Sequence, residues 1–114
     1  MIETIIKTYL EGKTDRPVRF ERSPNMPASC IVIEKTGSSY TEQLYTATIA
    51  IQSYGNTLAE AAALNADIVG WMLDIRDEEG NIFDITLNSD YNFTDTSTKR
   101  YRYQAVFVVS YYTD

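Results

Sequence analysis

The residues that could do chemistry in this chain are its sixteen acidic side chains, because histidine is absent and cysteine occurs once. Without an imidazole there is no Ser-His-Asp triad, no Cys-His pair and no histidine-ligated metal. Cys30 alone cannot form an internal disulfide or a thiolate zinc cluster. Catalysis by carboxylates and binding of a hard cation by carboxylate oxygens remain open.

Two arrangements of acidic residues bear on these options. Residues 88–92 resemble the first half of a calcium-binding loop, but Phe93 stands where the loop needs glycine, and Lys99 replaces the bidentate glutamate. A carboxylate pair such as Asp84 with Asp90 has no spacing that would hold the two groups together. We therefore expect no metal site, no cofactor and no enzymatic activity.

The formal net charge is −6, and all of this excess lies between residues 74 and 95. Arg76 is the one base in that segment, and the rest of the chain is neutral. Such a segment is either a solvated turn and loop or a surface that faces a basic partner. The acidic residues are Asp74, Asp77, Glu78, Glu79, Asp84, Asp90 and Asp95.

The net charge and the hydropathy pattern argue against nucleic acid and membranes as partners. An acidic chain is disfavoured as a nucleic-acid binder, because such binding depends on positive charge. No apolar stretch approaches the roughly 20 residues that cross a bilayer. The first ten residues carry Glu3 and Lys7 within their apolar pattern, so they do not resemble a signal peptide, and we expect an intracellular protein.

Tyrosine is unusually frequent near the C-terminus, where five of the nine tyrosines fall between residues 91 and 112. Strands favour aromatic residues, but tyrosine is also enriched at protein interfaces. Residues 99–103 alternate bases with aromatics, as proteins that bind single-stranded nucleic acid do. Given the acidic total, a basic strand end that meets an acidic surface of a neighbouring copy is the simpler interpretation.

The elements that position these residues follow from hydrophobic periodicity. Apolar residues at i, i+3 and i+4 predict an amphipathic helix at the N-terminus, ended by Gly12. A second helix is predicted from the capping box of Thr57 and Glu60 to Ile75. Gly70 within it predicts close packing against a sheet. Alternating patterns predict strands over 18–22, 30–35, 42–54, 82–87 and 99–112.

Loops are predicted at 36–41, which we expect to be flexible, and at 88–98. The strand at 42–54 is long for so small a chain, so part of it is expected to project beyond the sheet. The order α-β-β-β-α-β-β predicts one α+β domain over residues 1–114. We expect a single mixed, largely antiparallel sheet of about five strands with both helices on one face.

Several runs of this sequence resemble a known family. They are LNSDYNFTDT at 87–96, TKRYRYQAVF at 98–107, YLEGKTD at 9–15 with Pro17 and Val18, EKTG at 34–37 and ATIAIQSY at 47–54. These runs resemble small proteins from the head–tail gene cluster of long-tailed phages and prophages of Gram-positive bacteria. Such proteins are often called minor capsid or minor tail components, and they resemble tail terminator, or tail-to-head joining, proteins.

The resemblance implies a mixed sheet with helices on one face and a structural function. It implies a ring, typically hexameric, that caps the tail tube and docks it to the head connector. The implied partners are further copies of the chain, the tail tube protein and the connector or stopper. The implied location is the virion, after assembly in the host cytoplasm. Stopper, connector and head-completion roles are alternatives, and a generic soluble binding module is a further one.

Ring assembly would use the charged and exposed segments. A heterologous interface joins two different surfaces of one chain. We expect Asp74, Asp77, Glu78 and Glu79 to meet a basic surface of the neighbouring copy that contains Arg19, Arg22, Arg100 or Arg102. The loop at 36–41, with Ser38 and Tyr40, is expected to reach the tail tube or the connector.

Overall fold

The computed structural model describes residues 1–112, and its elements follow the predicted order. They are α1 (Ile2–Glu11), β1 (Val18–Arg19), β2 (Cys30–Thr41), β3 (Leu44–Gly55), α2 (Leu58–Leu73), the short 3₁₀ helix η1 (Ile75–Asp77), β4 (Ile82–Asn92) and β5 (Tyr101–Tyr112). The strands form one sheet in the order β1-β2-β3-β5-β4. β1 is parallel to β2 and the other neighbours are antiparallel, which confirms the α+β fold with a mixed sheet.

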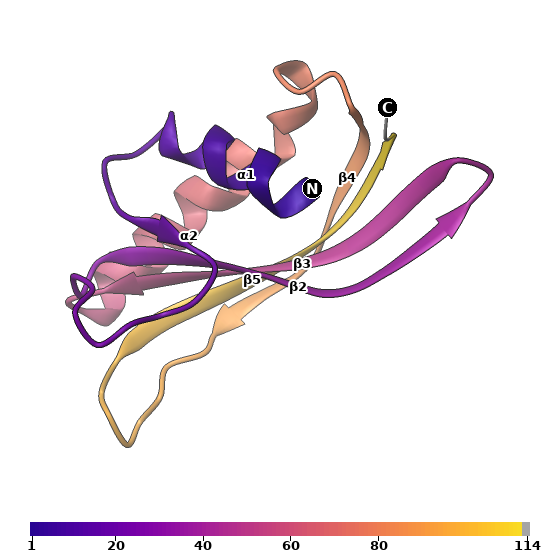
Figure 1. Cartoon of the computed structure of the whole chain (residues 1–114). Coiled ribbons are helices and arrows are strands. Elements are labelled where there is room, and N and C mark those ends of the chain that lie inside the picture. Colours follow the sequence, from indigo (N-terminus) through magenta and orange to yellow (C-terminus); the bar gives the residue numbers. More distant parts are fainter. Residues whose placement is uncertain (113–114) are drawn as a thin grey trace.

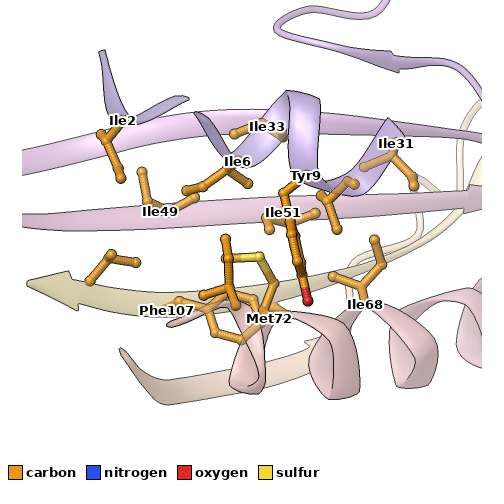
Figure 2. Packing of buried hydrophobic residues seen from close by; sticks show 14 of the residues in the cluster. Ile2, Ile6, Tyr9, Ile31, Ile33, Ile49, Ile51, Ile68, Met72 and Phe107 are labelled. Atoms are coloured by element: carbon orange, nitrogen blue, oxygen red, sulfur yellow. The ribbon is translucent and has the colours of Figure 1, made fainter. Parts of the chain in front are cut away.

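Both helices cover the same face of the sheet (Figure 1). Their apolar sides meet alternate residues of the strands in one core, which includes Ile6, Ile49, Ile68 and Phe107 (Figure 2). Tyr9 Oη also donates a hydrogen bond to the carbonyl oxygen of Trp71 at 2.6 Å, so the two helices are joined directly. This packing fixes the direction of α2 across the sheet.

The segment at 36–41, predicted as a flexible loop, is instead the second half of β2. It pairs with the first half of β3 through a turn formed by Glu42 and Gln43. Both turn residues have positive φ, 53° and 69°, as the two central positions of a type I′ turn require. The hairpin extends past the helices (Figure 1), but the expectation that β3 projects beyond the sheet is wrong, because all of its residues from Leu44 to Gly55 pair with β5.

The polar loop predicted at 88–98 is shorter than expected, because residues 88–92 continue β4. Tyr91 lies opposite Gln104 of β5 in this part of the ladder. The register shifts between Leu87 and Ser89, which interrupts the alternation of side chains. At the opposite edge, β1 has two residues in place of the predicted 18–22, and Pro17 correctly predicted an edge position.

Helix α2 begins at its predicted cap, where Thr57 Oγ1 accepts a hydrogen bond from Glu60 N at 3.1 Å. The reciprocal half of the capping box is absent, because the Glu60 carboxylate accepts from Asn56 Nδ2 at 3.3 Å instead. The expectation that Gly70 packs closely is wrong, since open space surrounds it. Gly55 is the close approach: a Cβ there would lie 2.6 Å from Ala61 N, so β3 can meet the start of α2 only through glycine.

Candidate functional site

The four acidic residues predicted to form an interface lie together after the C-terminal end of α2. Asp74 caps the helix, Asp77 ends η1, and Glu78 and Glu79 follow directly. Glu79 is half-buried and the other three are exposed. We call residues 74–79 the acidic loop.

Lys13, which follows the end of α1, brings one counter-charge to the acidic loop. Lys13 Nζ lies 2.7 Å from Glu78 Oε2, and the same nitrogen lies 5.1 Å from the centre of the Tyr9 ring. Burial raises the pKa of Tyr9, Lys13 opposes this rise, and the carboxylates of Glu78, Asp74 and Asp77 add to it. The hydrogen bond to Glu78 raises the pKa of Lys13. Among residues 1–112, Glu78 is the one acid of this loop with an ion-pair partner.

The rest of the predicted acidic segment is divided. Asp84, near the start of β4, lies at the same end as the acidic loop, 3.6 Å from Arg76 Nη1 of that loop. Asp90 lies near the other end of β4, and Asp95 lies beyond it and pairs through the backbone with Arg100. A strand of 11 residues extends about 35 Å. The negative charge is therefore divided between the two ends of the sheet.

The predicted basic residues gather at the opposite end of α2 from the acidic loop. Arg22, Lys99 and Arg100 contribute to the lining of a pocket of about 130 Å³, which we call the basic pocket. Gly55 and Asn56, which lead from β3 into α2, form part of the same wall. The complete lining is Arg22, Ala28, Tyr54, Gly55, Asn56, Lys99, Arg100 and Tyr101.

Tyr54 positions two arginines at this end of the molecule. The guanidinium of Arg22 lies 4.9 Å from the centre of the Tyr54 ring, and that of Arg102 lies 5.8 Å from it. Arg102 is held further, because its Nη1 donates to Tyr54 Oη at 2.9 Å and its Nε donates to the carbonyl oxygen of Phe93 at 2.7 Å. Arg22 Nε, in contrast, is buried and has no hydrogen-bond partner.

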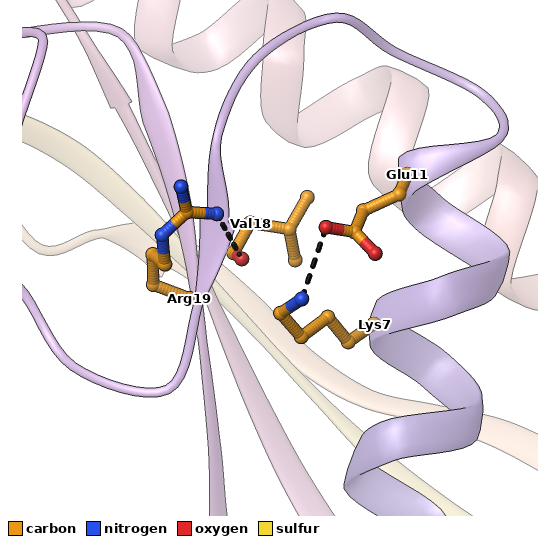
Figure 3. A network of polar contacts seen from close by, with 4 residues as sticks. All are labelled: Lys7, Glu11, Val18 and Arg19. Carbon is orange, nitrogen blue, oxygen red and sulfur yellow. Dashed lines mark hydrogen bonds and ion pairs between the residues drawn. The ribbon is translucent and has the colours of Figure 1, made fainter.

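Arg19, the remaining predicted base, lies on β1 and does not line the pocket. Its Nη1 donates to the carbonyl oxygen of Val18 at 2.9 Å, close to the Lys7–Glu11 ion pair on α1 (Figure 3). Cys30 is buried nearby. Burial raises the pKa of its thiol, and the neighbouring arginines oppose that rise, so the thiol is neutral at physiological pH.

A chain of side-chain hydrogen bonds runs from the basic pocket over the sheet face that the helices leave open. Tyr54 Oη donates to Gln52 Oε1 at 3.3 Å, and Gln52 Nε2 donates to Gln104 Oε1 at 3.0 Å. Gln104 Nε2 then donates to Tyr91 Oη. These bonds link β3, β5 and β4, and they hold the Tyr54 ring in the orientation that carries the arginines.

Ser38 and Tyr40 lie on the projecting β2–β3 hairpin, and both are exposed. The ring of Tyr40 packs against that of Tyr45 with centres 4.4 Å apart, and Tyr45 stacks on Tyr111 at 5.5 Å. Three tyrosines thus form a row across β2, β3 and β5. Tyr40, at its outer end, keeps 55% of its surface exposed.

Within residues 1–112, the sheet has an unpaired edge on each side. β1 pairs with β2 at Ile31 and Val32 alone, so the outer edge of β2 beyond Val32 has no strand partner within residues 1–112. β4 forms the other edge of the sheet. Unpaired edges of this kind present backbone donors and acceptors to other chains.

No group of three or more acidic or cysteine side chains in the described range is placed to hold a metal ion. No helix of residues 1–112 is long and apolar enough to cross a bilayer. Comparison of the sequence with models of protein families and with curated proteins finds no match.

Proposed function

We propose that this protein is a structural component of a long-tailed phage, a tail terminator that forms a ring, caps the tail tube and docks it to the head connector. The observation that carries the proposal is the separation of opposite charges along α2. The basic pocket precedes the helix and the acidic loop follows it. Two different complementary surfaces on one chain allow head-to-tail association, which closes into a ring when the rotation between copies permits.

The geometry of α2 supports this arrangement. The helix has 16 residues and is therefore about 24 Å long. Its buried residues, among them Leu64, Ile68 and Met72, attach it to the sheet along most of this length. The two charged surfaces are thus held at a fixed separation, and each copy repeats the same offset to the next.

The projecting hairpin provides a separate surface for partners other than copies of the chain. All residues of β2 from Glu34 to Thr41 are exposed, and Tyr40 is available for contact. Tyrosine supplies large and fairly rigid contact area at interfaces. In the proposed assembly this hairpin contacts the tail tube or the head connector, while the charged ends join the ring.

The function is tested by deleting the gene in the phage that encodes it, followed by electron microscopy of the lysate. A tail terminator predicts full heads and overlong tails that are not joined, and a plasmid copy of the gene restores virions. Emptied heads without tails would instead assign a head-completion or stopper role. Normal virions would contradict every assembly role proposed here.

A further inference from the structure

The basic pocket and the acidic loop each have the sign of charge that the adjacent end of α2 disfavours, whereas Glu60 in the first turn has the favoured sign. A helix carries partial positive charge at its N-terminus and partial negative charge at its C-terminus. The acidic loop adds negative charge at the C-terminus, where the last turn has no base, and the basic pocket adds positive charge beside the N-terminus. This placement opposes the stability of the free chain and strengthens the electric field at each end.

The basic pocket contains cationic groups without acidic partners. Arg22 Nε is buried and unpartnered, and the Nη1 of the same residue has only long contacts, 3.5 Å to the carbonyl oxygen of Pro27 and 3.6 Å to Cys30 Sγ. Lys99 and Arg100 form no ion pair with any described residue. A guanidinium with unused donors is the group that best binds a carboxylate through two hydrogen bonds.

The acidic loop offers the matching groups. Glu78 is already engaged by Lys13 at 2.7 Å, whereas Asp77 and Glu79 have no ion-pair partner among residues 1–112. The same fold therefore carries unpaired cations at one end of a rigid helix and unpaired carboxylates at the other.

We propose that the basic pocket is a carboxylate-binding site that receives Asp77 and Glu79 from a second copy of this chain. Arg22 is the receiving guanidinium, and Lys99 and Arg100 form the rim. The inference rests on the proposed function in taking this contact as the one that joins neighbours in the ring. A nucleic-acid phosphate has similar chemistry, but the net charge of −6 opposes association with a polyanion.

The contact is tested by trapping it covalently. One chain carries D77C and another carries R100C, and the mixture is oxidised gently. The native Cys30 is buried and does not compete. The control replaces D77C by D67C, a position in the middle of α2 that is also exposed. We expect the D77C–R100C mixture to form covalent dimers about tenfold faster than the control, because the proposed contact holds residue 77 beside residue 100 and so raises the effective concentration of the two thiols.

Further substitutions separate the pocket from its surroundings. R22Q in the R100C chain should bring the rate close to that of the control, and K99Q should reduce it in part without touching the Tyr54 ring. E78Q in the D77C chain should leave the rate unchanged, because Glu78 is already paired within its own chain. Equal rates for the D77C and D67C mixtures would overturn the proposal.

The remaining outcomes distinguish this contact from the proposed function and from a nucleic-acid site. Open filaments cross-linked from a chain that carries both D77C and R100C would support the pocket and contradict the terminator, whereas rings without the cross-link would do the reverse. A single-stranded DNA oligonucleotide that bound the wild-type chain, blocked the cross-link and lost affinity in R22Q would assign the pocket to phosphate and overturn the proposal.

Discussion

The two ends of α2 carry opposite charges but are built in different ways. At the basic end, Tyr54 holds Arg102 by a hydrogen bond and both Arg22 and Arg102 by cation–π contacts. At the acidic end the carboxylates project from a loop, and only Glu78 has an ion-pair partner among the described residues. The side chains of the basic end are thus ordered before a partner binds, and this end corresponds to a receptor. The acidic end corresponds to the ligand. A preordered receptor loses less side-chain entropy on binding.

The separation of the two charged ends depends on α2 as a rigid spacer, so loss of its packing should have the largest effect on stability. Ile68 is fully buried between α2 and the sheet. We expect I68A to lower the free energy of unfolding by about 2–5 kcal/mol, as other buried isoleucine truncations do. Urea denaturation followed by circular dichroism measures the change.

The control for this variant is D67A, which alters the exposed neighbour. Its free energy of unfolding should stay within about 0.5 kcal/mol of wild type. If I68A were as mild as D67A, α2 would not be anchored by this residue and could not set the separation of the two ends.

Tyr54 orders the basic end through its hydroxyl. Y54F removes the hydroxyl that accepts from Arg102 Nη1 and donates to Gln52 Oε1. We expect a loss of about 1–3 kcal/mol in unfolding free energy, because a partly buried charged donor loses its acceptor. Thermal denaturation of Y54F beside Y40F, which alters the exposed tyrosine of the hairpin, measures the difference. Equal midpoints for the two variants would show that Tyr54 does not order the arginines through its hydroxyl.

At the acidic end the expected effect on stability has the opposite sign. D77N combined with E79Q removes negative charge from the C-terminal side of α2, which should raise the free energy of unfolding by about 0.3–1 kcal/mol. E60Q is the matched control, because Glu60 lies in the first turn of the same helix and favours it. Hydrogen bonds from Ser29 and Asn56 lower the pKa of the Glu60 carboxyl, so E60Q should lose stability at neutral pH. A destabilised D77N/E79Q variant would contradict this description of the acidic loop.

The smallest predicted effect is a pH dependence at the acidic end. Burial and the carboxylates of the acidic loop raise the pKa of Tyr9 above its usual 10.0 in the folded chain. The folded state therefore holds this proton more tightly than the unfolded state does. Its contribution to stability is complete below pH 10 and declines as pH rises through the folded pKa. Denaturation from about pH 9 to about pH 12, which spans the usual tyrosine pKa of about 10, should show a shallower decline in Y9F than in wild type, and identical slopes would contradict the assignment.

Much of the fold could be predicted because its buried faces have regular periods. Ile31 with Ile33 on β2, and Ile49 with Ile51 on β3, show the alternation that a half-buried sheet requires. The outer half of β2 has no such signal, since Glu34 to Thr41 are exposed on both faces and are held by backbone pairing with β3. The turn at Glu42 and Gln43 lacks the Asn-Gly signature, so no local residue marked it.

The two charged ends also differ in how far the sequence could predict them. The acidic loop could be predicted because its residues are contiguous in the sequence. The basic pocket joins Arg22, Tyr54 and Lys99, which become neighbours only through the pairing of β3 with β5 and the path of the chain after β1. The alternation of bases and aromatics at 99–103 was the available signal, but it did not identify Lys99 or Tyr54 as part of one site.

The central claim is that the two ends of α2 join copies of the chain head to tail into a ring. The most direct measurement is negative-stain electron microscopy of purified tails capped by the wild-type chain or by a variant with D77K, E78K and E79K. We predict rings, typically of six copies, at the tail ends with the wild-type chain, and bare tail ends with the variant. Rings of the same size and occupancy in both samples would contradict the claim.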